Sequence, residues 1–66
     1  MPIASLDDVL VSLKRHVPSD LALGPVCTRV MLRTGVNLRA PKPEQRSDGA
    51  VVGKVLATLN DMGYAL

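Results

Sequence analysis

The stretch that decides the fold is the last third of the chain, residues 47–66, which reads SDGAVVGKVLATLNDMGYAL. Ser47 and Asp48 supply a capping hydroxyl and a negative charge, both of which stabilise the free amides at the start of a helix. Gly63 stands where the left-handed residue that ends a helix is expected. The sequence therefore predicts a helix that begins at Ser47 or Asp48 and ends at Gly63.

The two faces of this predicted helix differ in character. Apolar residues recur every three or four positions along one face, which we expect to lie in the core. These residues are Val51, Val52, Val55, Leu56, Leu59 and Met62. The opposite face carries Gly49, Gly53, Ala57 and Asn60. A glycine inside a helix costs roughly 1 kcal/mol relative to alanine, so we expect a close neighbour there: another part of the same fold, a phosphate chain or a second helix. Gly49, Gly53 and Ala57 form the candidate partner interface.

The length of the chain limits its core. With 66 residues there is room for one domain, residues 1–66, and Tyr64 is the only aromatic residue. A chain of this size buries only about 60% of the surface that it exposes when unfolded, so an aliphatic core is thin. We expect self-association, most simply as a homodimer, to add to its stability.

The residue inventory argues against catalysis. Cys27 is the only cysteine and His16 the only histidine, and the carboxylates are scattered, so we expect no metal site, no catalytic set and no cofactor. Cys27 is expected to be buried as a small apolar residue. Because the sequence has no signal peptide and no long apolar run, we expect a cytoplasmic protein without a membrane partner.

Two further helices are predicted upstream. Ser5 and Asp8 form a capping box at the start of the first, which Pro18 ends. The second begins at Pro25, whose missing N–H is harmless at the first helical position, and ends at Gly35. The inner face of the second helix is expected to comprise Val26, Cys27, Val30 and Met31, with Leu32 at its margin.

Two short extended segments complete the expected fold. Leu21–Leu23 is too short for a helix before Pro25. Tyr64–Leu66 follows the end of the last helix and is expected to start a strand beside the first segment. The sequence thus predicts a mainly α domain of three helices, with at most two very short strands and a long loop between the second and third helices.

That loop, VNLRAPKPEQR at residues 36–46, has no regular periodicity, and its two prolines stiffen it. Leu38 is expected to anchor it. Between Arg29 and Lys54 the chain holds six basic and two acidic residues, whereas the rest of the chain is net negative. Such asymmetry is typical of a phosphate-binding surface, although it also suits an ordinary solvated one.

Two segments carry a resemblance to a known family. VCTRVMLRTGVN, residues 26–37, followed by GAVVGKVLATLNDMGYAL, residues 49–66, resembles the winged-helix transcription regulators. The matching positions are Val52, Leu56, Leu59, Gly63 and Tyr64. The resemblance implies that residues 47–58 are a DNA recognition helix, with Arg46, Ser47 and Lys54 near phosphates. The chain departs from the family at the turn, which is about three or four residues long in a helix-turn-helix and eleven here.

We therefore expect a small protein that binds double-stranded DNA through phosphate contacts, as a transcriptional regulator or accessory factor. The candidate nucleic-acid contacts are Arg39, Lys42, Arg46, Ser47, Lys54, Arg29, Arg33 and Asn60, the last for a base contact. Five or six phosphate contacts would make log K fall with log salt at a slope of about −5. The alternative is a non-enzymatic adaptor or inhibitor that holds another protein through the glycine and alanine face of the third helix.

Overall fold

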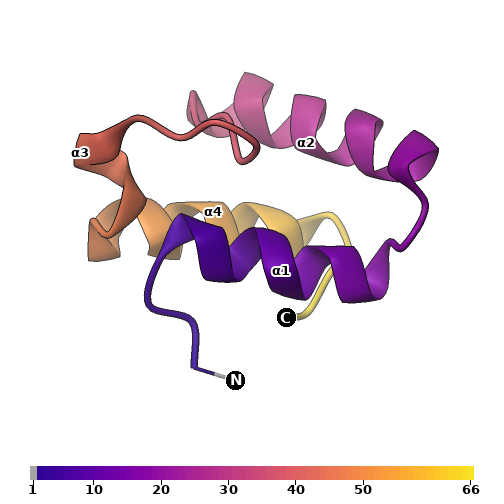
Figure 1. The fold of residues 1–66 in the computed structure, drawn as a ribbon, viewed down its shortest axis with the longest axis horizontal. Coiled ribbons are helices and arrows are strands. Elements are labelled where there is room, and N and C mark those ends of the chain that lie inside the picture. Colours follow the sequence, from indigo (N-terminus) through magenta and orange to yellow (C-terminus); the bar gives the residue numbers. More distant parts are fainter. Residues whose placement is uncertain (1) are drawn as a thin grey trace.

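The computed structural model describes residues 2–66, in which four helices and no strand are found. Helix α1 spans Leu6–His16, α2 Asp20–Thr34, α3 Pro43–Arg46 and α4 Gly49–Asp61. Figure 1 shows α2 along one side of the molecule and α1 and α4 on the other, with α3 in the segment that returns from α2 to α4. Helix α4 packs against the other three helices. The prediction of a mainly helical domain is confirmed.

The expected short strands are not formed within residues 2–66. Leu21–Leu23 lies inside α2, and Tyr64–Leu66 has no regular structure. The prediction failed at the first segment because Leu23 is buried in the core, and a helical path is what places it on the same face as Val26 and Val30. Tertiary burial outweighed the local preference for an extended chain before a proline.

Pro25 is the sixth residue of α2, so the prediction that it opens the second helix is wrong. The helix begins five residues earlier, at Asp20. A proline this near to the start of a helix removes one backbone bond, the one that its N–H would donate to the carbonyl of Leu21. Because Leu21 is 90% exposed, water can hydrate that carbonyl and the helix continues through the proline.

The expected loop at residues 36–46 contains α3, a fourth helix that the sequence did not predict. Pro43 occupies the first turn of α3, where its missing N–H costs nothing. Earlier in the loop, the side-chain oxygen of Asn37 accepts bonds from the amides of Arg39 and Ala40, at 3.0 and 3.3 Å. Leu38 is buried, which confirms that it anchors the segment.

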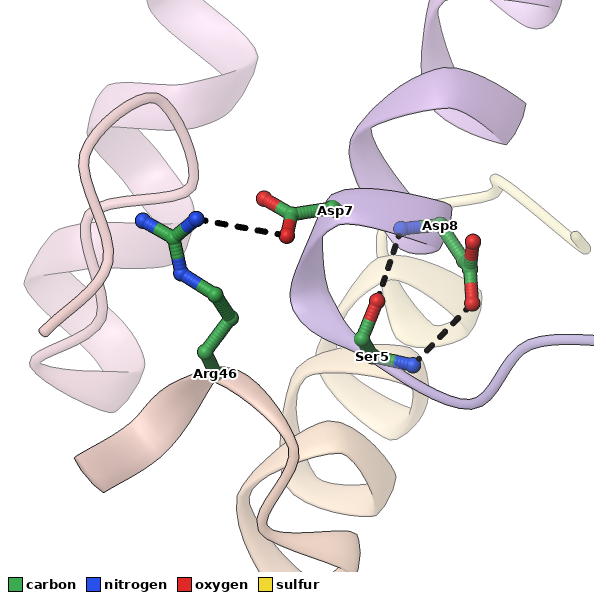
Figure 2. A network of polar contacts seen from close by, with 4 residues as sticks. All are labelled: Ser5, Asp7, Asp8 and Arg46. Carbon is green, nitrogen blue, oxygen red and sulfur yellow. Dashed lines mark hydrogen bonds and ion pairs between the residues drawn. The ribbon is translucent and has the colours of Figure 1, made fainter. Parts of the chain in front are cut away.

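The predicted helix caps are largely confirmed. Ser5 and Asp8 form the capping box of α1 (Figure 2). Asp48 is the N-cap of α4, and its carboxylate accepts bonds from the amides of Ala50 and Val51, whereas Ser47 ends α3. Gly63 is left-handed, with φ 98°, as expected of the residue after a helix.

The core is wholly aliphatic apart from one thiol. Thirteen of the described residues are buried and hydrophobic, and no polar residue is buried with them. They are Leu6, Val9, Leu13, Val17, Leu23, Val26, Cys27, Val30, Val36, Leu38, Val52, Val55 and Leu59. The accessible surface of 4044 Å² agrees with the roughly 4,000 Å² of a compact monomer of 7.0 kDa. The aliphatic core therefore closes within one copy of the chain.

An ion pair joins α3 to the first turn of α1. Nη1 of Arg46 lies 3.4 Å from Oδ2 of Asp7, as Figure 2 shows. The two side chains are 48% and 55% exposed, so water screens their attraction. The pair directs Arg46 toward α1 and adds little to the free energy of folding.

We predict opposite effects from alanine at two glycines. Gly53→Ala should raise the free energy of unfolding by about 1 kcal/mol, because a Cβ there meets no atom within 4 Å and alanine is the better helix former. Gly63→Ala should lower it by about 1–2 kcal/mol, because a side chain is strained at positive φ. Urea denaturation of the two variants and the unchanged protein measures both values, and a loss of stability in Gly53→Ala contradicts the open α4 surface.

The ion pair gives a second prediction. A double-mutant cycle of Asp7→Ala and Arg46→Ala should yield a coupling energy below about 1 kcal/mol, because both groups are half exposed. Thermal denaturation at low and at high salt is a suitable measurement, since salt should reduce the coupling further. A coupling of several kcal/mol would show that the pair fixes the position of α3.

Candidate nucleic-acid interface

A shallow groove between α2 and α4 brings together two of the predicted phosphate contacts. Arg33 comes from the last turn of α2, and Lys54 lies in the middle of α4. The groove is open to solvent, with a volume of about 580 Å³, and Ala57, Thr58 and Asp61 complete its lining. Residues 21 positions apart in the sequence thus place two cations around one concave surface.

The groove also contains an acid. Nη1 of Arg33 lies 3.4 Å from Oδ2 of Asp61, and both side chains are more than half exposed. A guanidinium has five N–H donors, so this single contact leaves most of the donors of Arg33 available. Thr58 donates its hydroxyl to the carbonyl of Lys54 at 2.9 Å, a bond within α4 that does not involve the ammonium group.

Arg29 lies one helical turn before Arg33 on α2 and is exposed. Residues four positions apart share one side of a helix, so Arg29 extends the positive surface along α2 beyond Arg33. We refer to Arg29, Arg33 and Lys54 as the α2–α4 cationic cluster. Asp61, which pairs with Arg33, lies beside this cluster.

The other predicted basic contacts lie elsewhere. A guanidinium nitrogen of Arg39 is 3.7 Å from the position that a Cβ on Gly24 would take, beside the first half of α2. Arg46 pairs with Asp7 at the start of α1. Lys42 is the exposed N-cap of α3. The three cations are close together in the sequence, but they lie at three different places on the surface of the fold.

The two polar candidates are both exposed. Ser47 caps the C-terminal end of α3 and makes no side-chain hydrogen bond within residues 2–66. Asn60 lies in the last turn of α4, next to Asp61. Neither residue lines the α2–α4 groove.

The small-residue face of α4 is open. Gly49, Gly53 and Ala57 are all exposed, and a Cβ added at either glycine would meet no atom within 4 Å. Of the three readings that the sequence allowed, packing against another part of the same fold is therefore wrong. The readings that need an external partner remain.

An exposed apolar surface on α2 was not predicted. Leu21 is 90% exposed, Leu32 is 79% exposed, and Met31, expected on the inner face, is also exposed. The spacing of Leu21 and Leu32 places them on one side of a helix. The sequence could have predicted this shared side only if α2 had been expected to start at Asp20, because a helix that starts at Pro25 does not include Leu21. Burial of Val26, Cys27 and Val30 is confirmed.

Other kinds of site find no support within residues 2–66. No group of three metal-ligating side chains is brought together there, and none of the helices is both long and apolar enough to cross a bilayer. Comparisons with family models, with curated proteins and with solved structures give no match.

Proposed function

We propose that this chain is a small cytoplasmic protein that binds double-stranded DNA and acts as a transcriptional regulator or accessory factor. The single observation that supports the proposal is the groove lined by Arg33 and Lys54, with Arg29 one turn away. An arginine and a lysine on either side of an open groove suit the oxygens of a phosphate backbone. Arg39, Lys42 and Arg46 are secondary contacts in this proposal, because they lie apart from the groove.

The proposal assigns α4 the place of the recognition helix of a winged-helix domain. Its exposed face offers Gly53, Ala57 and Asn60, and small side chains let the helix backbone approach a duplex closely. Only Asn60 has the amide group that reads an adenine edge. Contacts with phosphates therefore supply most of the affinity, and discrimination between sequences is small.

The ion pair with Asp61 sets a modest obstacle to this binding. A phosphate that enters the groove competes with one exposed carboxylate for the guanidinium of Arg33. Exposed ion pairs contribute about 0–1 kcal/mol, so the cost of replacing this one is small. Asp61 lies at one end of the groove and Lys54 two helical turns earlier, which leaves the end nearer Lys54 free of acid.

The salt dependence of binding tests the proposal. If the three cations of the α2–α4 cationic cluster supply the main phosphate contacts, the expected slope of log K against log salt is about −3, shallower than the −5 expected for five or six contacts. Fluorescence anisotropy with a random-sequence duplex at several salt concentrations measures the slope. Affinity that does not change with salt, or no binding at low salt, rejects the DNA proposal.

Lys54→Ala and Arg29→Ala, tested in the same assay, should each weaken binding to any duplex and reduce the slope by about one unit. Arg15→Ala is the matched control, since Arg15 is an exposed cation on α1, away from the groove. Equal losses from all three substitutions would assign binding to the overall charge of the protein instead of to this cluster.

The open face of α4 supports a second candidate function, that of an adaptor or inhibitor which binds a protein partner. Gly49, Gly53 and Ala57 are exposed and leave space for a second helix to approach the backbone of α4. A second copy of the chain is one such partner, in line with the homodimer expected from the sequence. The compact single-copy core means that this dimer is not needed to complete the fold.

Gly53→Leu distinguishes the homodimer from a free face. If two copies pair through α4, the larger side chain should separate them and convert dimers to monomers. Sedimentation equilibrium over a range of protein concentrations measures this, with Ala65→Leu as a control at an exposed position after α4. Wild-type protein that stays monomeric at high concentration, or dimers that survive Gly53→Leu, exclude this interface.

A further inference from the structure

Helix α2 carries apolar residues on both of its faces. Leu23, Val26 and Val30 are buried in the core, while Leu21 and Leu32 point away from it, 90% and 79% exposed. With Pro25 and Thr28 between them, the two leucines follow a spacing of four, three and four residues, the spacing that aligns side chains along one helix face. We call Leu21, Pro25, Thr28 and Leu32 the outer strip of α2. A helix that is apolar all round is a buried one, and the two leucines give α2 apolar side chains on the side opposite its core face as well.

The outer strip adjoins a groove between α1 and α2. This groove has a volume of about 460 Å³, and Leu21 belongs both to its wall and to the strip. Leu10 and Leu23 supply further apolar lining, and Lys14, Asp20 and Arg39 supply charged groups. The groove provides the concave pocket that a flat helix face lacks, and a bulky apolar side chain of a partner fits such a pocket.

The charges around this surface are mainly positive. Arg29 follows one edge of the outer strip, because it lies one residue beyond Thr28 on the helix. Arg39 lies along the other edge, where its guanidinium is beside Gly24, and Lys14 lines the same groove as Arg39. Asp20 is the one acid that lines this groove. A partner that covers the strip therefore meets cations on both sides.

This charge pattern disfavours a second copy of the chain. In an antiparallel two-fold pairing of α2 helices each edge of the strip meets the same edge of the other copy, so the edge with Arg29 meets its own copy and the edge with Arg39 meets its own copy. In a parallel pairing the Arg29 edge meets the Arg39 edge, and the charges are again alike. Like charges brought together oppose association, and they favour a partner of the opposite sign.

From these observations we propose that the outer strip of α2 and the adjoining groove dock an amphipathic helix of another protein, with aspartate and glutamate on both flanks of its apolar stripe. Leucines of that helix pack on Leu21 and Leu32, and its carboxylates pair with Arg29, Arg39 and Lys14. This is the helix-in-groove mode of recognition. From Leu21 to Leu32 the strip covers about 17 Å of helix, so about three turns of the partner make contact. The docking shares Arg29 with the α2–α4 cationic cluster, but it does not depend on DNA binding there.

Two designed peptides test the proposal. Both are helical, about 15 residues long, with leucines at the spacing of the outer strip; one has glutamates on both flanks, and the other has lysines at the same positions. The full chain is titrated into each labelled peptide, and the fluorescence anisotropy of the peptide reports binding. The glutamate peptide should bind with a micromolar dissociation constant. The lysine peptide should bind at least about tenfold more weakly.

Substitution of both leucines locates the binding. Leu21→Ser combined with Leu32→Ser should weaken binding of the glutamate peptide by at least about tenfold, because the peptide loses both apolar contacts. Neither leucine contributes to the core, and the circular dichroism spectrum checks that the fold is kept. Ala65→Ser is the control, at an exposed position after α4, and should leave the affinity unchanged.

Three results overturn the proposal: no binding of the glutamate peptide, equal binding of the two peptides, or unchanged affinity after loss of both leucines. Sedimentation equilibrium adds a fourth. If the wild-type chain forms dimers and the two leucine substitutions convert them to monomers, the partner that covers the outer strip is a second copy of the chain. DNA binding by the variant that lacks both leucines is measured in a separate titration with duplex DNA. The failure of the peptide docking can therefore be distinguished from the failure of the DNA proposal.

Discussion

The packing of α2 on α4 is the contact on which the rest of the structure depends. The interior has no Trp and no Phe, so its cohesion comes from aliphatic side chains, each of which contributes about 1.5–3 kcal/mol when fully buried. Val36 and Leu38, in the segment between the two helices, are buried in the same core. Their burial holds that segment against the helices, and it fixes where Arg39 emerges beside α2.

Local rules were enough to predict the helix ends. The caps at Ser5 and Asp48 and the left-handed Gly35 and Gly63 depend on hydrogen bonds and backbone angles within a few residues, and such signals are present in the sequence itself. The start of α2 was not predictable in this way. It depends on the burial of Leu23 in a core built from residues between Leu6 and Leu59, which outweighs the local effect of Pro25.

The sequence identified the basic residues of the candidate site, but it did not predict how the fold arranges them in space. Six basic residues are close in the sequence between Arg29 and Lys54, yet they reach different surfaces because α2, α3 and α4 present them in different directions. Asp7 and Arg46 are 39 residues apart in the sequence, and Arg33 and Asp61 are 28 residues apart. No local sequence pattern reveals ion pairs between residues so far apart. The open face of α4 was recognised from its glycines, but whether the fold covers it required the structure.

Pro25 has a consequence for the motion of α2. The turn that precedes it is joined to the remainder of the helix by one backbone bond fewer than usual, since no amide hydrogen is present to meet the carbonyl of Leu21. Ser19, at the start of that turn, makes no side-chain capping bond. Local opening proceeds most readily where such bonds are fewest, so we expect the first turn of α2, which precedes the buried Leu23, to open at a lower free energy than the rest of the helix. By this argument α2 combines a part that Leu23, Val26 and Val30 hold in the core with a more adjustable first turn that carries Leu21, its most exposed leucine.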